Sequence, residues 1–247
     1  MRHSLPWLKA KVSHLAILNY EVDAELLSPY VPYGLEIDLW EGQSFVSIVG
    51  FTFRQPRIFD IPVPCCQAFE QANLRFYVRR HTEAGLRRGV VFVCEVVPKR
   101  IVAFVARHIL REKYVYLPMN HHITCNEKPG QRQTRIEYQW YHHGRWHGIQ
   151  VQADHDPGLP EPGSQDAFFI ERDWGYTLRP DGSCLEYRFE HPRWQIRPAS
   201  AAAFTCDQGD IFGPDFGACL FKEPGSAFIS EGSEIELFPP HVLLGKT

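Results

Sequence analysis

Short strand-like segments, each ended by turn residues, follow one another along most of this sequence. Residues 35–40 and 73–79 alternate between apolar and polar side chains, the period of a strand with one face in the core. Residues 45–53 and 89–97 are apolar at most positions, as expected of strands buried on both faces. Further strand-like segments occupy residues 134–141, 146–153, 168–170, 185–189 and 235–238. So many strands with so few helices predict a barrel or sandwich with helical additions.

Turn residues between these segments predict how the strands pair. Residues 35–40 should form a hairpin with residues 45–53, and residues 73–79 should form one with residues 89–97. The short loop His142-His143-Gly144-Arg145 predicts a third hairpin, because Gly144 tolerates the positive φ of a tight turn.

Three segments are expected to be helical. A brief helix over Ala24–Ser28 begins after Asp23, which can cap it, and a second is predicted at residues 199–204. The clearest helix covers residues 99–111, where apolar side chains recur at helical spacing and should face the sheet. These side chains are Ile101, Phe104, Val105 and Ile109.

Bulk properties favour one soluble domain spanning residues 1–247, with 44% hydrophobic and 22% charged residues. The net charge is −3 without a basic run, so no nucleic-acid partner is expected. No apolar run approaches the roughly 20 residues of a membrane span, so no membrane partner is expected either. The seven cysteines and the lack of a signal peptide predict reduced thiols in the cytoplasm. A homo-oligomer is left open.

Familiar motifs for metals, cofactors and nucleophiles are absent from the sequence. The tandem pairs His121-His122 and His142-His143 point to opposite faces of a strand, so no metal site is predicted. No Gly-x-Ser-x-Gly elbow, dinucleotide-binding glycine motif or phosphate-binding loop occurs, so no cofactor is expected.

The segment 73–79 holds the main candidates for a ligand site. Asn73, Arg75 and Tyr77 share one face of this strand, opposite Leu74 and Phe76. If that face lines an enclosed interior, the three side chains can hold a carboxylate or carbonyl oxygen by charge-assisted hydrogen bonds. If it faces water, it is only the wet side of an antiparallel sheet.

Further candidates lie in other segments. Glu70 precedes the strand at residues 73–79. Arg107 is expected near the rim of the barrel, because its helix should lie on the sheet. Residues 168–176 contribute Glu171, Arg172 and Tyr176, for which the alternative interpretation is an exposed ion pair beside core aromatic residues.

The same segments resemble the YqjF-like family of uncharacterised domains, within the acetoacetate decarboxylase-like superfamily. The resemblance runs from residue 14 to about residue 196. It rests on the order and spacing of Asn19–Asp23, Gly34–Asp38, Phe45–Phe51, Asn73–Val78, Phe168–Tyr176 and His191–Trp194. It implies an α+β, mainly antiparallel β fold: a β-barrel or cone with a few flanking helices around a central cavity.

Acetoacetate decarboxylases use a lysine that forms a Schiff base with a ketone. Here Leu117-Pro118 is similar to the family's Phe-Pro, but Met119-Asn120 stand where the paired lysines are expected. Lys113 is the one lysine near that region. The sequence therefore predicts a pocket that binds or transforms a small carbonyl or carboxylate compound without a Schiff-base lysine. The alternatives are a lysine-dependent decarboxylase or aldolase-like enzyme using Lys113, and a non-catalytic protein-interaction module.

Overall fold

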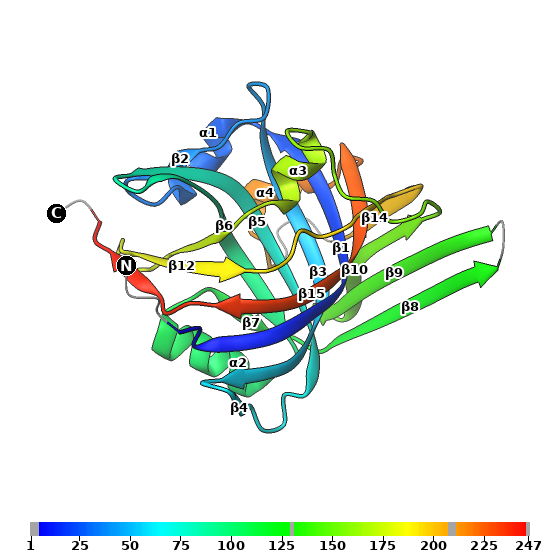
Figure 1. The fold of residues 1–247 in the computed structure, drawn as a ribbon, viewed down its shortest axis with the longest axis horizontal. Helices are drawn as coiled ribbons and strands as arrows, with labels where there is room; N and C mark the ends of the chain where they lie inside the picture. The colour runs from blue at the N-terminus through cyan, green and yellow to red at the C-terminus, as the bar shows by residue number, and fades with distance from the viewer. Residues whose placement is uncertain (1–4, 129–130, 207–210, 246–247) are drawn as a thin grey trace.

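The computed structural model describes residues 5–128, 131–206 and 211–245. Its largest element is a curled, mostly antiparallel sheet with the strand order β13-β15-β1-β3-β5-β6-β11-β12-β16. Among the strands of the described residues, only β7 and β11 pair in parallel, both with β6. Because β12 also pairs with β15, through Phe189 and Leu237, the circuit of paired strands returns to its start (Figure 1). The curled sheet therefore has an inner and an outer side.

A smaller antiparallel sheet, of order β14-β10-β9-β8, packs against the outer side. Its apolar face places Tyr138 and Trp140 in the same core as Leu18 and Ile48 of the large sheet. The Tyr138 hydroxyl donates to the carbonyl of His14 at 2.9 Å, which joins the two sheets. A second core lies on the inner side, where Phe168 and Phe169 of helix α3 pack against β1, β3 and β5.

The elements have the following bounds. The large sheet contains β1 (Leu8–Val22), β2 (Glu36–Ile37), β3 (Ser44–Ile58), β4 (Ile61–Pro62), β5 (Ala68–Thr82), β6 (Gly85–Val97), β7 (Tyr114–Tyr116), β11 (Trp174–Leu178), β12 (Cys184–Glu190), β13 (Arg197–Pro198), β15 (Ser226–Leu237) and β16 (His241–Leu243). The small sheet contains β8 (Met119–Lys128), β9 (Gln131–His142), β10 (Arg145–Ala153) and β14 (Ala201–Thr205). The helical elements are α1 (Ala24–Leu27), the 3-10 turn η1 (Ser28–Tyr30), α2 (Arg100–Val105), the π-helical turn η2 (Ala106–Leu110), α3 (Gln165–Ile170) and α4 (Pro214–Leu220).

Much of the predicted architecture is confirmed. The fold is α+β and mainly antiparallel, β5 pairs with β6, and β9 pairs with β10. The turn between β9 and β10 has a φ of 82° at Gly144, the conformation for which glycine was expected there. Helix α1 begins after Asp23, whose carboxylate accepts a hydrogen bond from the amide of Glu25. Among the described residues, no helix has the length and apolar character to cross a membrane.

Three local predictions are wrong. Residues 36–37 pair with β5 and not with β3, so the first predicted hairpin does not form. Residues 168–170 belong to helix α3, because Ser164 caps it by accepting from the amide of Ala167. Residues 201–205 form an edge strand beside β10, where tertiary pairing overrides the helical propensity of the alanines.

The helix predicted at residues 99–111 exists, but its orientation differs from the prediction. It divides into α2 and η2, and Ala103 and Ala106 are its buried residues. Ile101, Phe104 and Ile109 are 58%, 57% and 66% exposed. Small side chains therefore let this helix approach the sheet, and much of its apolar surface is left outside.

Candidate functional site

Four neighbouring strands present one row of side chains to the inner side of the large sheet. Val49 of β3 pairs with Asn73 of β5, which pairs with Glu95 of β6, which in turn pairs with Tyr114 of β7. Directly paired residues lie on the same face of a sheet, so the four side chains project into the same space.

This row lines a cavity of about 320 Å³. Most of its wall is aromatic or aliphatic, and its lining includes Val12, Leu15, Val49, Phe51, Phe53, Phe69, Phe92, Tyr187, Phe189 and Ile235. Ile58, Ile101 and Val105 line the cavity and are also exposed, so its mouth lies beside α2. A cavity of this size, apolar with few polar groups, is typical of small-molecule sites.

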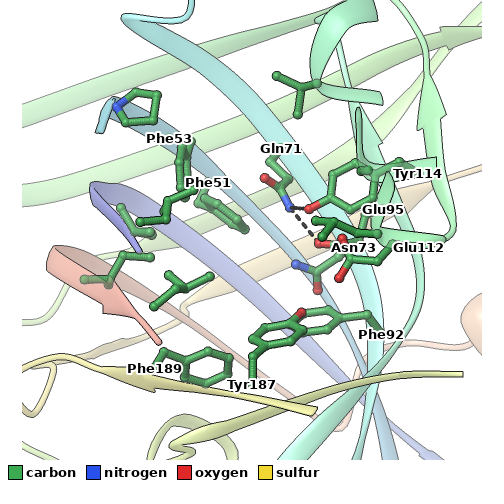
Figure 2. Close-up of a pocket in the computed structure, with 18 of the residues that line it drawn as sticks. Phe51, Phe53, Gln71, Asn73, Phe92, Glu95, Glu112, Tyr114, Tyr187 and Phe189 are labelled. Atoms are coloured by element: carbon green, nitrogen blue, oxygen red, sulfur yellow. Dashed lines mark hydrogen bonds between the residues drawn. The ribbon is translucent and has the colours of Figure 1, made fainter. Parts of the chain in front are cut away.

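Five polar side chains gather on one wall of the cavity, and we call them the polar cluster: Gln71, Asn73, Glu95, Glu112 and Tyr114 (Figure 2). Gln71 Nε2 donates to Glu95 Oε1 at 2.7 Å and lies 3.4 Å from the Tyr114 hydroxyl. Asn73 is 3% exposed, and its Oδ1 has no hydrogen-bond partner among the described residues. A buried polar atom without a partner is costly, which favours a ligand or water beside Asn73.

Burial changes the acidity of the two carboxyl groups. Burial raises the pKa of Glu95 well above its usual value, the charge of Glu112 raises it further, and hydrogen bonds from Tyr114 and Gln71 offset part of the rise. Burial also raises the pKa of Glu112 to about 7, although the nearby charge of Arg179 acts in the opposite direction. The surroundings of the cluster therefore favour the protonated form of Glu95, and the Glu112 carboxyl titrates near neutrality.

Glu112 enters the cavity because of the backbone at the end of η2. Arg111 has a φ of 58°, in the left-handed region, and the amide of Glu112 donates back to the carbonyl of Ala106 at 3.0 Å. The chain then continues into β7, where side chains alternate. Glu112 and Tyr114 line the cavity, whereas Lys113 between them is exposed and its Nζ lies 5.6 Å from the ring centre of Tyr30.

Two guanidinium groups line another part of the cavity, which we call the arginine end: Arg75 and Arg172. Arg172 donates to Asp38 and to the carbonyl of Phe168, yet its Nη2 has no partner among the described residues. The Nε of Arg75 is likewise buried without a partner in the described part of the chain. His191 and Trp194 also line the cavity, and burial lowers the pKa of His191, which favours its neutral form.

Asn73, Arg75 and Arg172 are the sequence-predicted candidates that the structure brings together at the cavity. Tyr77 shares their side of the sheet, but its ring packs on Phe168 and Phe169 and its hydroxyl lies 2.5 Å from Ser47 Oγ.

The remaining candidates lie elsewhere. Glu70 faces the other side of β5, as strand alternation requires, and contacts His121 Nδ1 at 2.7 Å. Arg107 is exposed on η2, and Glu171 pairs with Arg193 near the surface. The Tyr176 hydroxyl donates to Glu186, in the core between the sheets. A ligand role for these four residues, and for Lys113, is not supported by their placement.

Sequence reasoning missed four members of the polar cluster: Gln71, Glu95, Glu112 and Tyr114. Glu95 was detectable, because a carboxylate in the otherwise apolar segment 89–97 is unusual for a buried strand. Glu112 was not, because Arg111-Glu112-Lys113 has the composition of a solvated turn.

Comparison with known proteins agrees with this architecture. The chain is 28% identical over 189 residues to the uncharacterised protein YqjF of Bacillus subtilis (strain 168), covering 74% of this chain and 72% of that protein. It superposes on the enduracididine biosynthesis enzyme MppR complexed with pyruvate with a TM-score of 0.69 and 17% identity, covering 100% of this chain and 93% of MppR.

Acetoacetate decarboxylase from Legionella pneumophila superposes with a TM-score of 0.66 and 11% identity, covering 98% of this chain and 88% of the decarboxylase. At these identities the likeness establishes the fold, which is acetoacetate decarboxylase-like. The model of the DUF2071 family, described as an uncharacterised conserved protein, matches residues 9–234. The chain therefore belongs to the DUF2071 family.

Proposed function

We propose that the cavity binds a small organic carbonyl compound without forming a covalent bond to lysine. The observation that carries the proposal is the polar cluster, a set of hydrogen-bonding groups on one wall of a largely apolar cavity. Apolar walls take the body of the ligand, and the few polar groups orient it. None of the described residues lining the cavity is a lysine.

The protonated Glu95 is suited to a carbonyl oxygen. A neutral carboxylic acid is a hydrogen-bond donor, and a carbonyl oxygen accepts without bringing a charge into an apolar space. Asn73 and Arg75 are two residues apart on the same face of β5, so roughly 7 Å separates their Cα atoms. A carboxylate attached close to the carbonyl can therefore extend toward the arginine end.

A carbonyl compound that carries a carboxylate is supported by two further observations. The unpartnered donors of Arg75 and Arg172 are suited to a carboxylate, which accepts charge-assisted hydrogen bonds. In addition, the enzyme MppR, which has a similar fold, is known in complex with pyruvate, a compound with adjacent carbonyl and carboxylate groups. The lysine-dependent alternative has less support, because Lys113 points away from the cavity.

Binding of two matched compounds tests the proposal. Phenylacetone and phenylpyruvate share an aromatic body and a ketone, and phenylpyruvate carries a carboxylate where phenylacetone has a methyl group. Calorimetry should show that both bind, and that Arg75→Gln weakens phenylpyruvate by about 10- to 100-fold while phenylacetone is unaffected. Lys113→Gln is the control and should change neither affinity. Borohydride treatment with either ketone should leave the intact mass unchanged; a lysine adduct, or no binding of either compound, would overturn the proposal.

The cytoplasm remains the compartment we propose. Its support is the adjacent pair Cys65 and Cys66, both with free thiols, of which Cys65 is exposed.

A further inference from the structure

The two carboxyl groups of the polar cluster line the same cavity but come from different elements of the fold. Glu95 comes from the middle of the large sheet, on β6, and Glu112 comes from the connection between η2 and β7. The amide of Glu95 donates to the carbonyl of Lys113 at 3.0 Å, so the backbones that carry the two carboxyls are hydrogen-bonded to each other. Figure 2 shows both side chains beside Asn73 on the cavity wall.

The two carboxyl groups differ in how readily they hold a proton. Two like charges close together in an apolar space cannot both persist, so one carboxyl retains its proton. Glu95 is enclosed by Gln71 and Tyr114, neither of which carries a positive charge, whereas Glu112 faces the cation Arg179. Tyr187 also faces the pair, and its own pKa is raised by burial and by both carboxylates, so it stays neutral. The stable arrangement is therefore a carboxylic acid on Glu95 and a carboxylate on Glu112.

Asn73 supplies an independent indication that a ligand belongs at this wall. Its buried Oδ1 lines the cavity without a partner in the described residues, beside its pairing partner Glu95. A ligand oxygen that becomes a hydroxyl during a reaction would donate to this acceptor.

We propose that Glu112 and Glu95 act as a base and an acid that interconvert a bound ketone and its enol. The Glu112 carboxylate takes a proton from the carbon next to the carbonyl, and the electron pair of that C–H bond forms the C=C bond. The electrons of the C=O π bond move to oxygen, which takes the proton of Glu95. The products are an enol, a protonated Glu112 and an ionised Glu95, so charge is conserved and no oxidant is needed. This inference rests on the proposed function, since the ketone must first bind.

Exchange of carbon-bound protons tests the inference. With phenylacetone in D₂O, proton NMR should show the benzylic signal disappearing faster with the protein than in buffer alone. Glu112→Gln should slow the protein-dependent exchange by at least about 100-fold, with phenylacetone affinity changed less than twofold. Lys113→Gln, altered at the neighbouring exposed residue, should exchange at the wild-type rate.

The pH profile of the wild-type protein provides a measurement that needs no variant. Exchange should rise with pH around 7, as Glu112 becomes a carboxylate that can accept a proton. Phenylacetone that binds but exchanges only at the buffer rate, or a rate independent of pH between 5.5 and 9, would overturn the acid–base role while leaving the proposed function intact. Absence of phenylacetone and phenylpyruvate binding would overturn both.

Discussion

Arg172 Nη1 donates to Asp38 Oδ2 at 2.5 Å, and the two side chains are only 3% and 1% exposed. The Arg172 guanidinium also lies 4.1 Å from the ring centre of Phe168, so the ion pair is surrounded by aromatic residues of the inner core. The pair therefore holds the connection after α3 against the segment that follows β2, next to the arginine end of the cavity.

Removing one member of this pair should destabilise the protein strongly. Among the described residues, Arg172→Met leaves Arg88 Nε, 3.7 Å away, as the remaining ionic neighbour of the buried Asp38 carboxylate. We therefore expect a loss of about 3–5 kcal/mol in the free energy of unfolding. The double variant Arg172→Met/Asp38→Leu should lose less than Arg172→Met alone, because no uncompensated charge remains. Urea denaturation measures both; equal losses would contradict the explanation.

Gly148 allows β9 and β10 to lie as close as they do. A Cβ at this position would lie 2.2 Å from the carbonyl oxygen of Tyr138, which belongs to the backbone and cannot rotate away. We expect Gly148→Ala to cost at least about 2 kcal/mol and to lower the thermal midpoint. Gly158→Ala is the matched control, because its Cβ would meet nothing within 4 Å; a similar loss in both variants would rule out crowding as the cause.

The stability of the protein should fall as pH rises through the acidic range. The folded state binds a proton at Glu112 up to a pKa of about 7, whereas an ordinary glutamate releases it near 4.5. Between these values the folded state holds more protons, so its advantage is complete below pH 4.5 and is lost as pH approaches 7. The full effect is on the order of 3 kcal/mol.

Glu112→Gln should reduce this dependence, because glutamine does not titrate. Chemical denaturation at intervals between pH 4.5 and 8 should therefore give a shallower decline for Glu112→Gln than for the wild-type protein. Parallel curves would show that other groups cause the decline.

Tyr77 should prove to be a structural residue. Its hydroxyl and the Ser47 hydroxyl lie 2.5 Å apart, and Ser47 donates onward to Asn19. Tyr77→Phe should cost about 1 kcal/mol of stability in urea denaturation. Because Tyr77 packs on α3 instead of lining the cavity, affinity for phenylpyruvate should change less than twofold; a larger drop would restore the ligand role predicted from the sequence.

Strand alternation is the part of the site that the sequence predicts well. It places Asn73 and Arg75 on one face of β5, and both line the cavity. The same rule fails on β6, where the register shifts opposite Leu74 and Arg75, so that Phe92 and Glu95 both line the cavity although they are three residues apart. A bulge of this kind has no clear sequence pattern in an apolar strand.

Long-range pairing explains most of what the sequence could not predict. Residues 36–37 pair with β5, and the chain between them and β3 forms a turn closed by Trp40 and Gln43. Local spacing in the sequence does not distinguish β3 from β5 as the partner of residues 36–37. The parallel pairing of β11 with β6 joins segments far apart in the chain, without a turn to indicate it. Tyr114 joins the polar cluster through another parallel pairing, that of β7 with β6, which local rules do not reveal either.

Arg111, in the left-handed conformation at the end of η2, sets the direction in which the next side chains point. The side chains of Glu112 and Tyr114 point into the cavity, and that of Lys113 points outward. The number of residues between η2 and β7 therefore decides which side chains meet a ligand. If one residue before Lys113 were deleted, the inward-facing and outward-facing side chains would change places. The Lys113 amine would then enter the cavity where the Glu112 carboxyl now lies. A one-residue insertion or deletion at this connection would therefore change the chemistry that a ligand meets without replacing any side chain of β7.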